Sequence, residues 1–236
     1  MSFSNLFNSD SSNDDEHWIS VSDLMAGLMV IFLFIAISYM KDILIEKDRI
    51  QEIAVTWNET QEALYVDLQT EFQADLPKWG ALLDRDTLSI RFQEPSVLFD
   101  TGQTSLKPQF KIILDDFFPR YLSVLEKFRD EIAEVRIEGH TSSVWGGKTN
   151  GMDAYFKNMR LSQGRTRSVL FYCLGLPSVQ DEREWARGTI TANGLSSSKP
   201  ILTKGGQEDA TLSRRVEFRV RTNAESRIIE ILQVQK

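Results

Sequence analysis

The sequence predicts an α+β protein in which a single N-terminal transmembrane helix leads through a helical linker into an α/β sandwich domain. Residues 24–40 form an apolar run without a charged side chain, which is typical of a membrane-spanning helix. A charged, helix-prone segment follows, and beyond it strand-like and helix-like patterns alternate, as in an α/β domain. The predicted divisions are a short tail at 1–17, a transmembrane helix at 18–40, a helical stalk at 41–75 and a folded domain at 76–236.

The predicted transmembrane helix is long enough to cross the ~30 Å hydrocarbon core of a bilayer, because Trp18, Ile19 and Val21 extend the apolar run to about twenty residues. A cleaved signal peptide would have a basic start, a shorter apolar core and a small-x-small cleavage site. No Lys or Arg precedes Lys41. We therefore expect an uncleaved membrane anchor.

Asp23 is the charge that needs an explanation, because it lies more than one helical turn inside the predicted span. A carboxylate there costs about 2.5 to 3.5 kcal/mol on insertion scales, and such residues usually serve ion pathways or proton relays. Desolvation penalises the charged form, so the group can bind and release a proton. Ala26 and Gly27 share its helix face and leave room for a partner helix or water. Alternatively, Asp23 lies at the headgroup boundary and caps the helix with Ser20 or Ser22.

Composition narrows the class of protein. The 236 residues carry a net charge of −7, which argues against a nucleic acid as partner. Cys173 is the single cysteine, so an internal disulfide framework is excluded. His17 and His140 are the only histidines, and with one thiol they give no zinc-binding spacing. We predict neither a metal nor a cofactor.

In the stalk, apolar residues recur at seven-residue spacing, at Ile43, Ile50, Trp57 and Leu64. Such a seam is typical of a short or imperfect coiled coil, so we expect a homodimer. The alternative is that the membrane helix continues to Ile45 and that the rest is a solvated linker.

The folded domain is predicted to begin after a boundary segment at 75–86, which contains Pro77 and Gly80. Alternating or periodic apolar residues then predict its elements. Pro119 is expected to interrupt the first helical region. In order, the predicted elements are a strand at 88–92, one or two helices at 107–129, a strand at 132–138, a glycine-bearing loop at 139–151, a helix at 153–174, strands at 189–192 and 215–221, and a short helix at 225–234.

His140 is followed by Thr141, Ser142 and Ser143, which brings a base next to hydroxyl groups. Neighbouring side chains on an extended strand point to opposite faces, so these residues do not make a catalytic pair. The Gly-Gly-Lys-Thr run at 146–149 has the end of a phosphate-binding loop but lacks its first glycine. We predict that the protein is not an enzyme.

Asp23, Met25, the small residues after them and the apolar run form a pattern that resembles the single-pass B subunits of ion-driven rotary motors, the family of the flagellar stator protein MotB. The resemblance implies that Asp23 carries the ion. We expect a proton, because no second polar cluster for sodium is present in this run.

Five ordered segments of the domain are similar to the OmpA C-terminal peptidoglycan-binding domain. The resemblance covers nearly the whole domain and implies that it binds the diaminopimelate stem peptide of the bacterial cell wall. The matching segments are SVLFDTGQTSLKPQ at 96–109, VRIEGHTS at 135–142, NMRLSQGRTRSVLFYCL at 158–174, ANGLSSSKPI at 192–201 and SRRVEFRV at 213–220.

The same resemblance implies the binding residues. Arg165 holds the position of the family's binding arginine, and a guanidinium group suits bidentate contact with a free carboxylate. Asn158 and Leu161 match residues that orient the ligand and shape its pocket, and Thr141 and Ser142 match the binding strand end. From the residues alone, Asn158 could instead be a helix N-cap, Leu161 a core residue and Arg165 part of a surface salt bridge.

Ser142 departs from the family pattern, which has at this position an aspartate that contacts the ammonium group of the ligand. Serine accepts a hydrogen bond but carries no charge. The amine contact is therefore expected to be weaker, or to shift to another acid such as Asp153 or Glu138. Arg214 and Arg215 match the family's arginine pair, although such arginines are as often solvated.

The short acidic tail and the run SDLMAGLMVIFLFIAI at 22–37 resemble the ZorB family of Zorya antiphage defence systems. This resemblance implies a ring of ZorA- or MotA-like multispanning partners, a place in the bacterial inner membrane, a cytoplasmic N-terminus and a periplasmic domain. Lys41, Lys47 and Arg49 follow the helix, so the positive-inside rule favours the opposite orientation. A flagellar stator subunit and a passive cell-wall tether are the alternative functions.

Overall fold

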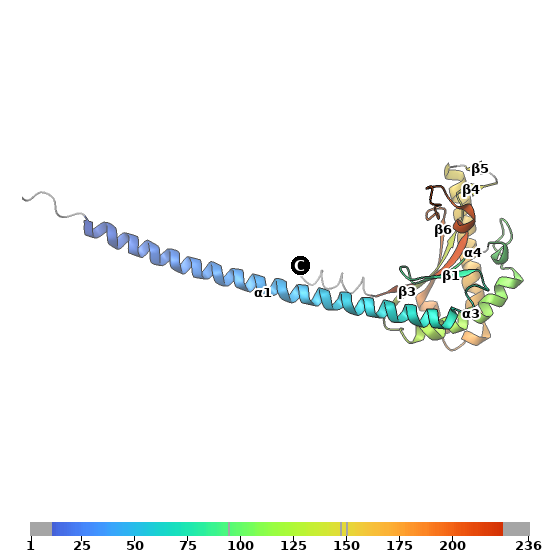
Figure 1. Ribbon diagram of the computed structural model, residues 1–236, viewed down its shortest axis with the longest axis horizontal. Coiled ribbons are helices and arrows are strands. Elements are labelled where there is room, and N and C mark those ends of the chain that lie inside the picture. The colour runs from blue at the N-terminus through green and yellow to red at the C-terminus, as the bar shows by residue number, and fades with distance from the viewer. Residues whose placement is uncertain (1–10, 94, 147, 150, 224–236) are drawn as a thin grey trace, which may run out of the picture. The chain divides into compact units, whose positions relative to one another are not determined.

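A computed structural model describes residues 11–93, 95–146, 148–149 and 151–223 (Figure 1). The chain divides into two compact units, Met1–Ala54 and Val55–Lys236. Helix α1, Ser11–Phe72, runs across this division. The short helix predicted at 225–234 lies outside the described residues.

Helix α1 contains the predicted apolar segment. Its stretch Val21–Gln51 is long and apolar enough to cross a membrane. The most apolar part of this stretch has a mean hydropathy of 2.3, and none of that part is buried among the described residues. Large apolar side chains such as Met29 and Phe34 are about three-quarters exposed, at 75% and 73%. Side chains of this kind are stable when lipid or another subunit surrounds them.

The domain is built on a five-stranded sheet with the spatial order β1-β2-β7-β3-β6. Every neighbouring pair is antiparallel except β3 and β6, which are parallel and therefore need a crossover connection. The strands predicted from alternating apolar residues are confirmed as β2, β3, β6 and β7. In spatial order the strands are β1 Ala81–Asp84, β2 Ser89–Phe92, β7 Arg215–Thr222, β3 Ile132–His140 and β6 Ile190–Ser196.

The two long helices of the domain are α3, Pro108–Glu126, and α4, Gly151–Leu174, and both were expected from the apolar periodicity. Helix α4 supplies the crossover between β3 and β6. A short hairpin, β4 Val144–Trp145 with β5 Lys148–Thr149, lies between β3 and α4. The remaining elements are α2 Pro95–Leu98, the 3₁₀ helix η1 Pro177–Val179, α5 Arg183–Thr189 and α6 Ala210–Ser213.

The core is rich in aromatic residues and lies between one face of the sheet and α3. Phe117 of α3 packs against Phe92 of β2 and Phe218 of β7, with ring centroids 5.2 Å and 5.0 Å apart. Gly139 of β3 lies on the same face, because it pairs with Val216, and there it contacts α4. Both long helices therefore cover one face, and the opposite face carries mostly charged side chains.

The last turns of α1 are part of this domain. Leu64, Leu68 and Phe72 are fully buried in its core. Arg120 of α3 donates to Glu71 Oε1 at 2.6 Å, and its guanidinium group lies 5.0 Å from the ring centroid of Phe72. Leu64 is thus a core residue of its own chain and not part of an exposed coiled-coil seam, whereas Ile43 and Ile50 are exposed. The side chain of Trp57 lies outside the described part of the chain.

Two expectations were wrong. Pro119 does not interrupt α3, which continues from Pro108 to Glu126. Proline removes one backbone hydrogen bond, but the buried residues Phe117, Phe118 and Tyr121 hold both sides of the helix in the core. The segment expected as a plain boundary contains β1, which pairs with β2.

Candidate functional site

Helix α4 lies close against the sheet, and two glycines make this possible. A Cβ atom on Gly139 of β3 would lie 2.7 Å from Thr166 Cγ2 and 3.0 Å from the Ser162 carbonyl oxygen. A Cβ atom on Gly194 of β6 would lie 2.6 Å from the Cα of Gln163. Real Cβ contacts are longer, so glycine at both strands sets the spacing between α4 and the end of β3.

Asn158 connects α4 to the segment that follows β3. Its side chain is buried, and its Nδ2 donates to the Ser142 carbonyl at 3.0 Å. Thr141 and Ser142 are buried as well, and the Thr141 amide donates to the Ser196 carbonyl of β6 at 2.9 Å. The Thr141 hydroxyl is buried, and no described residue forms a hydrogen bond with it. Asn158, Thr141 and Ser142 are therefore brought together, and Asn158 is not a helix N-cap.

Arg165 lies two turns further along α4 and is held by the segment before α3. Its Nε donates to the Gln103 carbonyl at 2.9 Å, its Nη2 donates to the Asp100 carbonyl at 3.1 Å, and its guanidinium carbon lies 4.7 Å from the ring centroid of Phe99. Burial and repulsion from Arg214 lower the pKa of Arg165 to about 10. The group is still charged at neutral pH, and its positive charge lacks a nearby compensating carboxylate among these contacts.

A pocket joins Arg165 to the end of β3. Three arginines line it, and one of them, Arg215, is paired with Glu217. Arg165 and Arg214 bring further positive charge, and Leu98 and Phe99 are apolar lining residues. Leu161, the remaining predicted contact, is half-buried on α4 and lies outside the hydrophobic core. The residues that line the pocket are Leu98, Phe99, Gly139, His140, Ser162, Arg165, Arg214, Arg215 and Val216.

Sequence reasoning missed the carboxylate that contacts the strand end. Glu208 accepts hydrogen bonds from the Ser143 amide at 3.0 Å and from the Ser143 hydroxyl. It therefore brings an acid next to Ser142, where the sequence itself has none. The two acids suggested from the sequence lie elsewhere: Asp153 is exposed and paired with Lys157 at 2.7 Å, and Glu138 is on the opposite face of the sheet.

That opposite face carries a buried charged cluster beside the pocket. His140 Nε2 lies 3.7 Å from Glu138 Oε2 and 3.9 Å from Glu217 Oε1. Glu217 Oε1 also accepts from Arg215 Nε at 2.5 Å and from Arg91 Nε at 2.9 Å. Burial alone would raise the pKa of Glu217, but the hydrogen bond and attraction from Arg215 outweigh it, so the pKa is lowered.

Glu138, His140 and Glu217 each offer one ligand atom, and these atoms lie within 4.8 Å of one another. Charge nevertheless argues against a divalent cation there, because Arg91 and Arg215 already contact Glu217. A cation of charge +2 would leave the buried cluster with excess positive charge, which is costly in a protein interior.

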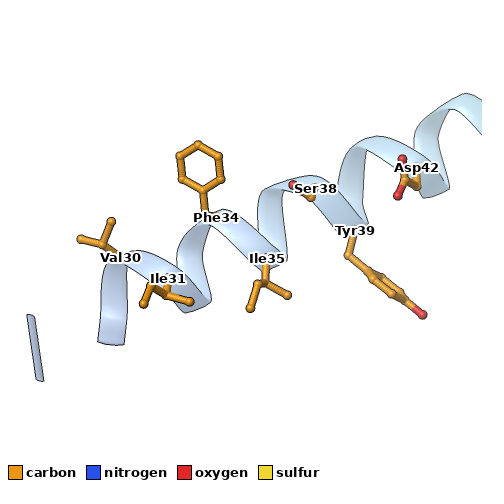
Figure 2. Close-up of a pocket in the computed structure, with 7 residues that line it drawn as sticks. All are labelled: Val30, Ile31, Phe34, Ile35, Ser38, Tyr39 and Asp42. Carbon is orange, nitrogen blue, oxygen red and sulfur yellow. The ribbon is translucent and has the colours of Figure 1, made fainter. Parts of the chain in front are cut away.

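The other predicted site residue, Asp23, is exposed on α1 near the start of the apolar stretch. Further along the same helix the side chains border a shallow groove (Figure 2). Figure 2 shows that Val30, Ile31, Phe34 and Ile35 make the groove apolar at one end. At the other end it is bordered by Ser38, Tyr39 and Asp42. This surface of α1 is available for packing against another helix.

Comparison with solved structures gives partial likenesses. A MotB-like protein from Desulfovibrio vulgaris has a TM-score of 0.49 and 25% identity, with 69% of this chain and 91% of that protein covered. The cell wall anchor of the type VI secretion system from Pseudomonas aeruginosa has a TM-score of 0.45 and 22% identity, with 66% of this chain and 96% of that protein covered.

Comparison with known sequences is more decisive. No family model matches the chain. The Zorya protein ZorB of Escherichia coli strain Crooks is 53% identical over 220 residues, which are 93% of this chain and 94% of that protein. The Zorya protein ZorB of Escherichia coli O139:H28 strain E24377A is 27% identical over 230 residues, or 92% and 87% of the two chains. At such identity over nearly the full length, the chain belongs to the ZorB family of Zorya proteins.

Proposed function

We propose that this protein is the B subunit of a proton-driven rotary membrane motor that is anchored to peptidoglycan and acts in Zorya-type antiphage defence. The observation that carries the proposal is the position of Asp23 in the apolar stretch of α1. The most apolar part of this stretch is not buried among the described residues. A membrane anchor needs no acid at such a position, whereas a proton carrier does.

Within the membrane, Asp23 binds and releases the transported proton. Protonation neutralises the carboxylate and changes its preference for the surrounding subunits, which drives a rotation step. The exposed side chains of α1 pack against a ring of ZorA- or MotA-like multispanning subunits, and the groove in Figure 2 is one surface for such packing. The protein acts there as a homodimer, for which the exposed Ile43 and Ile50 provide apolar contacts.

At the other end of the chain, the domain binds the diaminopimelate stem peptide. Arg165 and Arg214 supply positive charge for its carboxylate, and Asn158 fixes the segment with Thr141 and Ser142 beside it. Leu161 shapes the apolar side of the site. Glu208 replaces the aspartate that the family has at position 142, because its carboxylate lies against Ser143. Since peptidoglycan lies outside the inner membrane, the domain is periplasmic and the N-terminus cytoplasmic.

The motor function is tested with Asp23→Asn in a strain that expresses the complete Zorya system. We expect the variant to insert into the membrane normally but to lose phage protection and proton flux in membrane vesicles. Asp48→Asn is the matched control, because it removes another exposed carboxylate of α1 that does not border the groove, and it should retain flux. Full activity of Asp23→Asn would leave a passive wall tether as the better account.

Wall binding is tested by cosedimentation of the purified protein with cell-wall sacculi. Arg165→Ala should greatly reduce cosedimentation, whereas Arg167→Ala, an exposed arginine on the same helix, should not. Arg165→Lys separates the effect of charge from that of shape, because lysine keeps the positive charge but lacks the planar guanidinium group that makes two parallel hydrogen bonds. Equal binding by all variants would refute the assignment of Arg165.

A further inference from the structure

His140 is a buried imidazole, and neither of its ring nitrogens has a hydrogen-bond partner among the residues that the structure describes. Its side chain is 2% exposed, and its Nε2 faces Glu138 at 3.7 Å and Glu217 at 3.9 Å. A buried polar group without a hydrogen-bond partner destabilises the folded state. In the protonated imidazole both nitrogens are donors, and a shift of about 1 Å would bring Nε2 into hydrogen-bond distance of a carboxylate.

The charged cluster around His140 contains one more carboxylate than it has guanidinium groups. Ion pairs link the charged residues of β1, β2 and β7, and Glu138 of β3 joins them through its contact with His140. Buried charges are stable when they are paired. When Asp84, whose side chain is 32% exposed, is counted with the cluster, one added proton completes the balance without exceeding it. The cluster has two guanidinium groups and three carboxylates: Arg91, Arg215, Asp84, Glu138 and Glu217.

The pocket described above adds positive charge on the other side of His140. Arg165 of α4 and Arg214, which precedes β7, line it together with His140. Ser162 of α4 and Ser196, the β6 neighbour of His140, bring no charge. Neither Arg165 nor Arg214 forms an ion pair within the part of the chain that the structure describes, so their charges oppose a third positive charge nearby. A bound carboxylate would remove that opposition.

We propose that His140 takes up a proton when a carboxylate ligand binds beside Arg165 and Arg214. The inference rests on the wall-binding function proposed above and adds a pH dependence to it. By thermodynamic linkage, the ligand then binds more tightly as the pH falls through about 8 to 5, where histidine changes charge. The uptake of one proton limits the gain to about tenfold in affinity for each pH unit.

The test is titration calorimetry of the full-length protein in detergent with a diaminopimelate-containing tripeptide, in buffers that differ in ionisation enthalpy. We expect net proton uptake on binding at pH 7. His140→Gln should abolish the uptake, and His17→Gln should leave it unchanged, because these are the two histidines of the sequence. Unchanged proton uptake in a folded His140→Gln protein would overturn the proposal.

A second measurement does not depend on that variant. In protein labelled at histidine, His17→Gln identifies the ring signals of His140, and added tripeptide should move them toward the protonated position at constant pH. Binding with an unmoved ring signal and a pH-independent affinity overturns the proton uptake but leaves wall binding intact. Failure of the wild-type protein to bind the tripeptide at any pH, and of sacculi to retain it, overturns both.

Discussion

The side-chain amide of Asn158 on α4 donates a hydrogen bond to the main-chain carbonyl of Ser142, 3.0 Å away, and so connects the helix to the segment after β3. Asn158→Ala removes this donor and leaves a buried carbonyl with less hydrogen bonding. We expect a loss of about 1 to 3 kcal/mol in the free energy of unfolding, measured by urea denaturation. Lys157→Ala, which breaks only an exposed ion pair with Asp153, should cost less than about 0.5 kcal/mol. Similar losses in both variants would contradict this role of Asn158.

Glu217 should make the domain sensitive to acid. Its pKa in the folded protein is lowered, because Arg215 outweighs the effect of burial, so its stabilisation is complete above the unfolded value of about 4.3. That stabilisation is lost as the pH falls through the folded pKa. Glu217→Gln should therefore cost about 3 kcal/mol at pH 7 and flatten the fall in stability below about pH 4. Urea denaturation from pH 3 to 7 measures both effects.

A suitable control for this experiment is Glu184→Gln, because Glu184 is 83% exposed in its pair with Arg187. Glu184→Gln should change neither the stability at pH 7 nor the fall in stability at acid pH. A Glu217→Gln protein with the same fall in stability at acid pH as the wild type would show that Glu217 is not a source of the pH dependence.

The close contact between β6 and α4 predicts a large difference between two glycine substitutions. Gly194→Ala would force a Cβ atom to 2.6 Å from the Cα of Gln163, and overpacking of this kind costs about 1 to 3 kcal/mol. Gly188→Ala, in α5, has no neighbouring atom within 4 Å and should be neutral or stabilising by up to about 1 kcal/mol. Thermal unfolding of the two proteins distinguishes the cases. Equal melting temperatures would show that α4 can move away from β6 freely.

Arg120 should hold the last turns of α1 in the domain. It contacts Glu71 at 2.6 Å and Asp75 at 3.1 Å, and these contacts outweigh burial to raise its pKa above the usual value. Arg120→Ala should speed amide hydrogen exchange in residues 64–72, and Lys78→Ala, at an exposed pair with Asp75, should not. Unchanged exchange in Arg120→Ala would mean that apolar packing alone holds these turns.

Apolar periodicity was sufficient to predict the elements that face the core. Phe92 and Phe218 alternate with polar residues on half-buried strands, and both strands were found. Pro119 was misjudged because its local cost is offset by packing of residues that come together only in the folded domain. The short strand β1 was missed because its four residues, Ala81–Asp84, are too few to show a pattern of alternating apolar and polar side chains. It also follows Pro77 and Gly80, which indicate a turn.

In the candidate site, too, the sequence identified residues within one segment but not contacts between segments that are far apart in the chain. Asn158 and Arg165 could be named because a segment resembling a known family contains both. Glu208 could not, because it meets Ser143 across 65 positions of sequence through a loop without periodicity. From the sequence, His140 was considered only for catalysis and for zinc binding. Its carboxylate neighbour Glu217 lies on another strand, so the sequence alone could not bring the two together.

Gly139 and Gly194, which lie under α4, limit how the candidate site can change through substitution. The distance between the helix that carries Arg165 and the strand that leads to Thr141 is set by Gly139 and Gly194, which have no side chain, and not by the side chains that line the pocket. In the proposed wall-binding site, substitutions at these lining side chains can thus change which chemical groups are recognised while the spacing between α4 and the sheet is preserved. A change at either glycine would instead alter that spacing for every ligand at once.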